Sequence, residues 1–262
     1  MKSTLKSVLF CIAFTILFIA ASFLKNLIPA EYERWAHGII GTLVAFIVTF
    51  IFLKIDKRTW SQVNLVPDNK TILKFLSGII IGIVLMAPLA LLSIHYSGAS
   101  IEFNSASGLV SFLLSTAALI PLAFMEELGF RAYPLETIKE KSGIRISLLI
   151  TAVLFALYHF ANGWSITSSF MGPFVWGLIF GLGAVAGRGI ALSTGIHYAA
   201  NLTTAAFGMA GSTSSLFILK ENETMQVSGN HLQLFISAGL FVLAAILIEL
   251  YIKRNNADKR YA

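Results

Sequence analysis

Residues 72–94 of the chain read ILKFLSGIIIGIVLMAPLALLSI and contain a single charged residue, Lys74. A helix of about 20 apolar residues is long enough to cross the roughly 30 Å hydrocarbon core of a bilayer. The run is continuously apolar and does not alternate, which indicates a helix and not a strand of a barrel. A helix also satisfies its backbone hydrogen bonds within its own segment. This stretch therefore predicts a transmembrane helix.

The whole chain has the same character. Of its 262 residues, 56% are hydrophobic and 12% are charged, and the mean hydropathy is +0.79. This composition excludes a soluble globular protein and indicates an integral membrane protein. We expect an all-α, polytopic bundle of about eight transmembrane helices, at residues 5–24, 37–55, 72–94, 108–130, 146–161, 166–187, 190–209 and 232–252.

The basic residues predict the orientation of the bundle. Lysine and arginine near helix ends favour the cytoplasmic side. With the N-terminus inside, 16 of the 19 basic residues fall in cytoplasmic segments, and Lys25, Arg34 and Lys220 fall outside. We therefore expect cytoplasmic N- and C-termini in a multi-pass protein of the cell membrane. This spread also explains the net charge of +6 without a nucleic-acid partner, which would need one clustered basic face.

One structural domain accounts for the chain. Residues 1–107 hold about three helices without a chemical motif, residues 108–207 hold the motifs described below, and residues 208–262 form an external loop, the last helix and a basic cytoplasmic tail. The first apolar run resembles a secretory signal peptide, but its length favours a retained helix. The single cysteine excludes an intrachain disulfide and a cysteine metal cluster. Glycine pairs four residues apart predict close helix approaches, at Gly78/Gly82, Gly177/Gly181 and Gly183/Gly187.

Two adjacent acids interrupt the apolar run at 108–130. Glu127 and Arg131 are four residues apart and share a helix face, which predicts an internal ion pair. Glu126 points about 100° away and is free for another partner, as a general base or a proton shuttle requires. The alternative is a helix end at the water interface. Two acids inside an apolar helix count against that alternative, because ionisable groups in a membrane are costly and mark functional sites.

Two histidines lie in later apolar runs, and Asn201 follows His197 by one helical turn. An imidazole and a carboxamide on one face can donate hydrogen bonds to a developing oxyanion. With a rise of 1.5 Å per residue, Glu126 and His159 lie about 20 Å, and His197 about 13 Å, from the cytoplasmic ends of their helices. We therefore expect the three to share one layer. A histidine near a helix end is also a common packing residue or interfacial anchor, which is our expectation for His37.

Three motifs occur in order on consecutive helices, namely Glu126-Glu127-x-x-x-Arg131, Phe155-x-x-x-His159 and His197-x-x-x-Asn201. Over about residues 108–207 they resemble the CPBP intramembrane proteases, the family of CAAX prenyl endopeptidases, Abi proteins and bacteriocin-processing enzymes. The resemblance implies peptide-bond hydrolysis near the cytoplasmic side, with Glu126 activating water and His159 assisting. Glu127 and Arg131 would hold the site together, and His197 with Asn201 would stabilise the tetrahedral intermediate. The substrate would be a membrane-associated peptide or protein, either prenylated or carrying a leader peptide.

The sequence leaves the cofactor open. Glu126, His159 and His197 are the one plausible set of Zn²⁺ ligands, and they would leave a position for water. An H-E-x-x-H run is absent from the sequence, which excludes two ligands on one helix in the zincin manner. If Glu126 bound the metal, Glu127 or another group would have to act as the base, and this role of Glu127 conflicts with its pairing to Arg131. We therefore favour the metal-free version of the reaction, in which Glu126 is the base.

Other classes of protein use similar residues. A transporter or channel would relay protons or bind a cation through these acids and histidines. In a transporter, broken helices and polar groups should recur in both halves of the chain. The polar motifs lie in the second half, which counts against this alternative. A catalytically inactive immunity or scaffold protein of the same fold would keep the motifs. A serine protease is disfavoured, because G-x-S-x-G is absent and Ser193 is more simply a packing hydroxyl.

Overall fold

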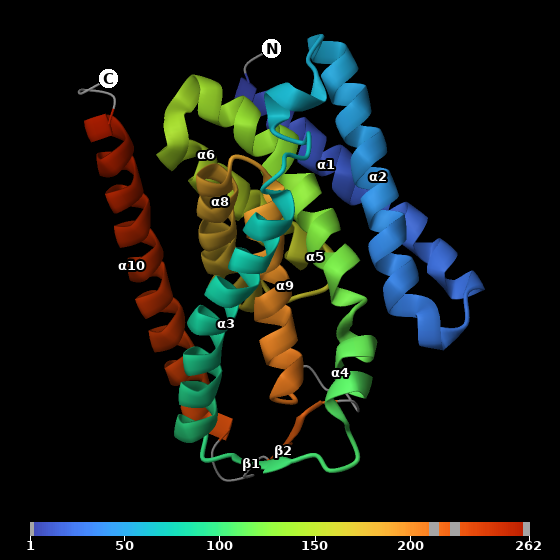
Figure 1. Ribbon diagram of the computed structural model, residues 1–262, viewed down its shortest axis with the longest axis vertical. Coiled ribbons are helices and arrows are strands. Elements are labelled where there is room, and N and C mark those ends of the chain that lie inside the picture. The colour runs from blue at the N-terminus through green and yellow to red at the C-terminus, as the bar shows by residue number, and fades with distance from the viewer. Residues whose placement is uncertain (1–2, 210–214, 221–225, 259–262) are drawn as a thin grey trace.

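A computed structural model describes residues 3–209, 215–220 and 226–258 of the chain. The described chain is an all-α bundle with two short paired strands at one end (Figure 1). The last residues of the predicted basic tail, including Lys259 and Arg260, lie outside the described residues. The α-helices are α1 (Ser3–Ser22), α2 (Glu33–Asp56), α3 (Thr71–Tyr96), α4 (Leu109–Thr116), α5 (Leu119–Glu127), α6 (Tyr133–Ala161), α7 (Ile166–Ser169), α8 (Val175–Gly187), α9 (Ile190–Ala206) and α10 (Gln226–Asp258).

Several stretches of the described chain have the length and composition of membrane spans. Six helical stretches are long and apolar enough to cross a bilayer, namely Ser3–Leu27, Ala30–Asp56, Thr71–Tyr96, Leu109–Ala161, Ile166–Gly187 and Gln233–Asn256. Each overlaps at least one run that the sequence predicts as a transmembrane helix. The protein is therefore a multi-pass membrane protein, as its composition predicts.

Two features explain why the sequence predicts eight transmembrane helices whereas the structure has six long apolar helical stretches. The predicted helices 108–130 and 146–161 both lie in the stretch Leu109–Ala161, which has 53 residues. The helical path is broken inside α6 at Gly143, where φ is +78°, a left-handed conformation that favours glycine. The predicted helix 190–209 corresponds to α9, which has 17 residues. The difference in count thus comes from one glycine turn and one short helix.

The predicted helix 108–130 is itself divided. α4 ends at Thr116 and α5 begins at Leu119, so that Pro121 falls in the first turn of α5, where its missing N–H breaks no helical hydrogen bond. After Glu127 the chain continues as a π-helix, Leu128–Ala132, directly into α6. The acids therefore lie within a continuous helical path and not at a free helix end.

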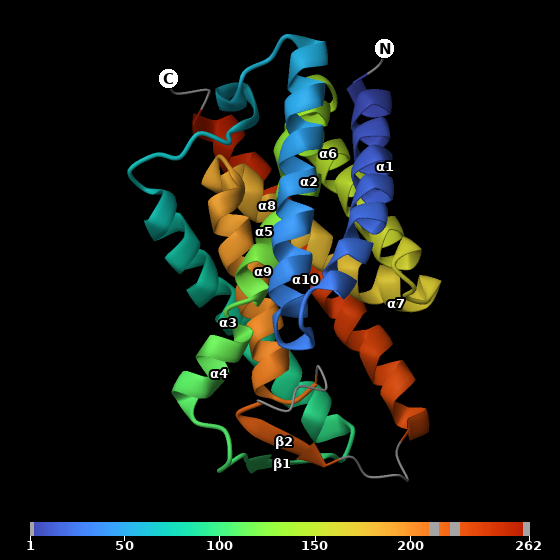
Figure 2. The ribbon, with the colours of Figure 1, turned by 90° about the vertical axis from the view of Figure 1, so that its right-hand side faces the viewer.

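The two ends of the described chain lie at the same end of the molecule. In Figures 1 and 2 α1 starts and α10 finishes at the top, where the α2–α3 connection and the turn between α8 and α9 also lie. The bottom of both views holds the two strands, and the α1–α2 connection lies in the lower half, above the level of the strands. The segments rich in basic residues therefore gather at the end where α1 starts.

The strands were not predicted from the sequence, which gave an external loop in this region. β1 (Ser100–Phe103) pairs antiparallel with β2 (Phe217–Lys220). The ring of Phe103 contacts that of Phe217 edge to face at 6.2 Å, and Lys220 forms an ion pair with Glu102 at 2.6 Å. The two strands lie more than 100 residues apart along the chain. Neither strand therefore has a pairing partner nearby in the sequence that would reveal it.

Glycines let the helices of the core approach closely, as their spacing predicts. A Cβ atom on Gly78 of α3 would lie 2.2 Å from the carbonyl oxygen of Leu192 in α9, and one on Gly82 would lie 2.6 Å from the Cβ of Ala199. Contacts this short are possible only without a side chain. The other two predicted pairs also face neighbouring side chains at 3.3 Å or less, at Gly177, Gly181, Gly183 and Gly187. Gly177 and Gly181 face residues of α6, whereas the packing that holds α9 in place depends on Gly78, Gly82, Gly183 and Gly187.

Candidate active site

The polar residues of the site come from three segments of the bundle core. α5 supplies Glu126 and Glu127, the π-helix that follows supplies Arg131, and α9 supplies His197. Single π-helical turns are rare and occur often at functional sites, because they change the direction of the side chains that follow. The sequence did not predict this turn.

Glu127 and Arg131 form the ion pair that their spacing predicts. Oε1 of Glu127 lies 3.6 Å from Nη1 of Arg131, and both side chains are 0% exposed. The guanidinium also stacks on the ring of Phe155 at 4.1 Å and donates a hydrogen bond from Nη2 to the carbonyl oxygen of Gly177 at 3.4 Å. Removing two charges from water is costly even when they pair. A buried ion pair in a membrane helix bundle therefore points to a functional role.

His197 bridges the two glutamates. Its Nδ1 lies 3.0 Å from Oε1 of Glu127, and its Nε2 lies 3.5 Å from Oε2 of Glu126. The imidazole is stacked against the ring of Phe180, with 4.2 Å between ring centroids and 13° between planes. Glu126 thus lies next to the imidazole of His197, one of the two histidines expected to lie near it.

The hydrogen bonds of His197 restrict where its protons lie. An ionised carboxylate only accepts hydrogen bonds, so an ionised Glu127 requires a proton on Nδ1 of His197. Nε2 of His197 then faces the Glu126 carboxylate at 3.5 Å. A carboxyl group and an imidazole placed side by side are the components of an acid–base pair.

His159 and Asn201 are placed differently. Nδ1 of His159 lies 2.9 Å from the carbonyl oxygen of Phe155, and its ring meets that of Trp164 edge to face at 5.2 Å. In the described part of the chain no hydrogen bond or ion pair joins His159 to Glu126 or His197. Asn201 is half-buried, one turn beyond His197 on α9. A shared layer of both histidines with Glu126 stays a prediction.

Two hydroxyl groups also belong to the site. The sequence analysis missed that of Tyr158 and assigned only a packing role to that of Ser193. The Tyr158 hydroxyl interacts with the Glu126 carboxylate, and Tyr158 is 5% exposed. The Ser193 hydroxyl donates a hydrogen bond to the carbonyl oxygen of Ile190 at 3.0 Å, as a packing hydroxyl does, but it also interacts with Glu127. The signal for Tyr158 was available, because a tyrosine in an apolar helix needs a hydrogen-bond partner for its hydroxyl.

The arrangement does not fit the zinc site that the sequence leaves open as an alternative. Among the described residues, no group of three or more His, Cys, Asp and Glu side chains is placed to hold a metal ion. Glu126 and His197 meet, but His159, the third predicted ligand, makes its contacts with aromatic rings. Three protein ligands are the usual minimum for catalytic zinc. A zinc site at these residues would need His159 to turn toward the other two.

The fold and the site together define a polytopic membrane protein with a buried acid–base cluster. Comparison with protein families identifies it further. Residues 106–203 match the model of the family described as type II CAAX prenyl endopeptidase Rce1-like. The matched region contains the residues of the three sequence motifs. The chain therefore carries a domain of this CAAX endopeptidase family, whose name implies membrane protease activity. A comparison with curated proteins gives no match.

Proposed function

We propose that the protein is an intramembrane endopeptidase that hydrolyses a peptide bond of a membrane-associated substrate. The observation that carries this proposal is the contact of Glu126 with His197, 3.5 Å from Oε2 to Nε2, beside the buried pair of Glu127 and Arg131. These groups lie in the part of the chain that matches a CAAX endopeptidase family. An acid–base pair in a water-poor site is suited to activating a water molecule.

The proposed reaction uses each side chain in one role. Glu126 takes a proton from a water molecule, assisted by His159, while the water oxygen attacks the substrate carbonyl carbon. The oxyanion that forms accepts hydrogen bonds from Nε2–H of the His197 imidazolium and from the Asn201 amide. The C–N bond then breaks, and the proton passes from Glu126 to the leaving nitrogen.

Glu127 and Arg131 support this chemistry without touching the substrate. Glu127 accepts the hydrogen bond from Nδ1 of His197 at 3.0 Å, which fixes the imidazole so that Nε2 points to Glu126. Arg131 compensates the charge of Glu127 inside the bundle. A group that reacts must be held in place by its neighbours for efficient catalysis, and this pair does so for His197.

The substrate class follows from the membrane setting and the family. We propose a peptide or protein attached to the bilayer, with prenylated CAAX-type proteins and leader peptides as the two classes to compare. Catalysis by Glu126 does not require a zinc ion in this proposal. Proton- or cation-coupled transport and an inactive scaffold or immunity protein are the alternatives, and a cleavage assay separates both from a peptidase.

The orientation is part of the same proposal. We propose eight passes through the cell membrane with both termini in the cytoplasm. Sixteen of the 19 basic residues then fall in cytoplasmic segments, which is the side that they favour. The common position of the start of α1 and the end of α10 in Figure 1 suits an even number of passes, and the turn at Gly143 divides the longest helical stretch into two.

The central experiment is a cleavage assay with purified protein in detergent. Prenylated and unprenylated peptide libraries are incubated with the parent protein, with Glu126→Gln, and with Glu102→Gln as a matched control on the exposed strand β1. We expect Glu126→Gln to lose about 10²- to 10⁴-fold in turnover, the typical contribution of a general base, and Glu102→Gln to match the parent. Thermal unfolding of each variant checks that it is folded. Parent-level turnover by Glu126→Gln would refute the assignment.

A further inference from the structure

The π-helix Leu128–Ala132 is buried along its whole length and carries Arg131. In a π-helix a carbonyl oxygen accepts a hydrogen bond from the N–H group five residues later. For the carbonyl of Gly129 that residue is Pro134, and a proline has no N–H group. A buried carbonyl that lacks its backbone donor needs a partner from elsewhere in the fold. The π-helix therefore depends on neighbouring elements for its support.

α1, which lies beside the start of α6 in Figures 1 and 2, supplies such partners. The thiol of Cys11 donates a hydrogen bond to the carbonyl oxygen of Gly129, with 4.0 Å between sulfur and oxygen. The hydroxyl of Ser7 donates a hydrogen bond to the carbonyl oxygen of Pro134 at 3.2 Å. Ser7 and Cys11 are four residues apart and share one face of α1. This face therefore bonds to the backbone within the π-helix and just after it.

Aromatic residues on the same side of α1 pack against the π-helix. Phe14 lies directly on Gly129, where a Cβ atom would be 2.6 Å from Cε1 of the phenylalanine. The ring of Phe14 also meets that of Phe130 edge to face at 5.7 Å. Phe10 stacks on Tyr133, the residue that follows the π-helix, at 5.1 Å. Glycine at position 129 thus lets α1 approach the π-helix closely.

The hydroxyl of Tyr133 connects the end of the π-helix to α2. Tyr133 is 0% exposed, and its hydroxyl donates a hydrogen bond to Oδ2 of Asp56 at 2.7 Å. Lys6 of α1 forms an ion pair with the same carboxylate. Hydrogen bonds to an ionised carboxylate are stronger than those between neutral groups. The first residue of α6 is therefore held by α2 as well as by α1.

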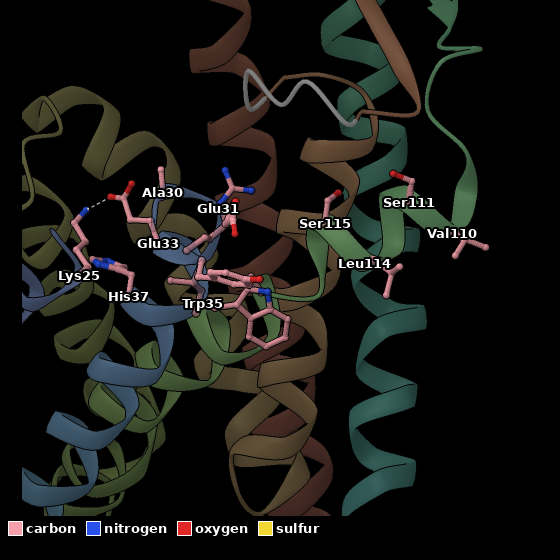
Figure 3. A pocket seen from close by; sticks show the side chains of 14 residues that line it. Lys25, Ala30, Glu31, Glu33, Trp35, His37, Val110, Ser111, Leu114 and Ser115 are labelled. Atoms are coloured by element: carbon pink, nitrogen blue, oxygen red, sulfur yellow. Dashed lines mark ion pairs between the residues drawn. The ribbon is translucent and has the colours of Figure 1, made fainter. Parts of the chain in front are cut away.

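Ion pairs connect the first helix to α2 at two levels. Lys6 pairs with Asp56, and beyond the other end of α1 Lys25 pairs with Glu33 at 2.7 Å (Figure 3). The second pair borders a pocket of about 1090 Å³ at the α1–α2 connection. Among the described residues, those that line this pocket do not include Glu126. Any contribution of α1 to the site therefore comes through the π-helix.

The π-helix determines where Arg131 lies. The guanidinium pairs with Glu127 at 3.6 Å and stacks on the ring of Phe155 at 4.1 Å. Glu127 in turn holds the imidazole of His197 at 3.0 Å, and the other ring nitrogen faces Glu126. A displacement of about 1 Å that originates far from the reacting atoms can cost about 10²-fold in rate. A loose π-helix would therefore disturb catalysis without removing any catalytic group.

We infer that Ser7 and Tyr133 are positioning residues of the active site, which hold the π-helix and through it the pair of Arg131 and Glu127. The inference rests on the proposed endopeptidase function and adds to it a support for the catalytic groups. α1 lies outside residues 106–203, the region that matches the family model, and it carries no chemical motif of its own. It nevertheless contributes to the reaction by fixing the backbone that carries Arg131.

The test removes one buried hydroxyl group at a time. Ser7→Ala removes the donor to the carbonyl oxygen of Pro134. Its matched control is Ser147→Ala, because Ser147 is also 0% exposed and its hydroxyl donates within α6, to the carbonyl oxygen of Ile144 at 2.8 Å. Both changes remove a hydroxyl from a buried serine, but only the first removes a hydrogen bond at the π-helix.

A second pair of variants uses tyrosines and decides the question should Ser7→Ala fail to fold. Tyr133→Phe keeps the aromatic ring and removes the hydrogen bond to Asp56. Tyr251→Phe is its control, because the Tyr251 hydroxyl donates to the carbonyl oxygen of Val185 at 3.5 Å. That hydrogen bond also joins two helices, α10 and α8, but it does not involve the π-helix.

Two measurements on the whole chain in detergent separate this inference from the proposed function. Hydrogen exchange of the backbone amides at residues 128–133, followed by mass spectrometry, reports on the π-helix without requiring activity. Exchange there should be about tenfold faster in Ser7→Ala and in Tyr133→Phe, the effect of one lost hydrogen bond, and unchanged in both controls. At a temperature at which all variants are folded, kcat for a cleaved peptide should fall about tenfold in the two π-helix variants, as misplaced supporting groups cause, and KM should stay unchanged.

Equal exchange in a π-helix variant and its control would overturn the inference. Faster exchange with an unchanged kcat would also refute it, because the π-helix would then move without effect on the reaction. The same fall of kcat in the controls would reduce the effect to a general loss of stability and would likewise count against positioning. Failure of the proposed function has a different signature, namely parent-level turnover by Glu126→Gln, and exchange at residues 128–133 then still decides whether Ser7 and Tyr133 hold the π-helix.

Discussion

Replacement of Glu127 by glutamine tests whether the buried ion pair holds the site together. The change keeps the size and shape of the side chain and removes its charge. Arg131 is 0% exposed and would keep its charge, with the carbonyl oxygen of Gly177 at 3.4 Å, the ring of Phe155 at 4.1 Å and the more weakly interacting Glu126 among its remaining contacts. The variant therefore leaves a buried charge without the carboxylate that pairs with it.

The expected cost follows from burial. Removing one partner of a buried ion pair costs about 3–5 kcal/mol, and solvent screening does not reduce this value because neither side chain is exposed. For a chain of this size 1 kcal/mol lowers the melting temperature by roughly 2–4 °C. Glu127→Gln should therefore lower the Tm by about 6–20 °C. Glu102→Gln breaks an exposed pair with Lys220 and should shift the Tm little, since such pairs contribute about 0–1 kcal/mol.

Thermal unfolding in detergent, followed by circular dichroism, measures both variants under the same conditions. Glu127→Gln should also lose most of its peptidase activity below its own Tm, because His197 loses the carboxylate that orients it. A Tm within about 2 °C of the Glu102→Gln control would refute the argument from burial. Full activity of a folded Glu127→Gln protein would show that orientation of His197 by this carboxylate is not required.

Three further predictions address packing, topology and metal dependence. Gly78→Ala should destabilise the protein by about 1–3 kcal/mol, the usual cost of overpacking, because the added Cβ would lie 2.2 Å from a backbone oxygen. Gly239→Ala is the control, since its Cβ would have no atom within 4 Å. Equal Tm values for the two variants would contradict the prediction. In a Cys11→Ser background, Ser61→Cys and Ser100→Cys should react with an impermeant thiol reagent from opposite sides of sealed vesicles, and labelling of both from one side would exclude the proposed topology. Chelators should leave peptidase activity unchanged, since the described residues form no three-ligand site, and restoration of lost activity by added Zn²⁺ would establish metal dependence.

The sequence alone determined the class of protein and the local part of the site. Apolar runs long enough to cross a bilayer depend on composition along a single segment, and the six candidate spans lie where such runs were predicted. The pair of Glu127 and Arg131 was predictable for the same reason, because residues four apart on a helix meet whatever the rest of the fold does. The motifs also indicated the family that the comparison found.

Only the tertiary structure decided which groups from different helices meet. His197 contacts both glutamates because α9 is held against its neighbours at glycines such as Gly78, whereas His159 packs among aromatic rings. The pocket at the α1–α2 connection depends in the same way on how α2 lies on α5. Helical periodicity fixes the face on which a side chain lies, but the close packing of several helices selects its partner, and no local pattern in the sequence encodes that choice.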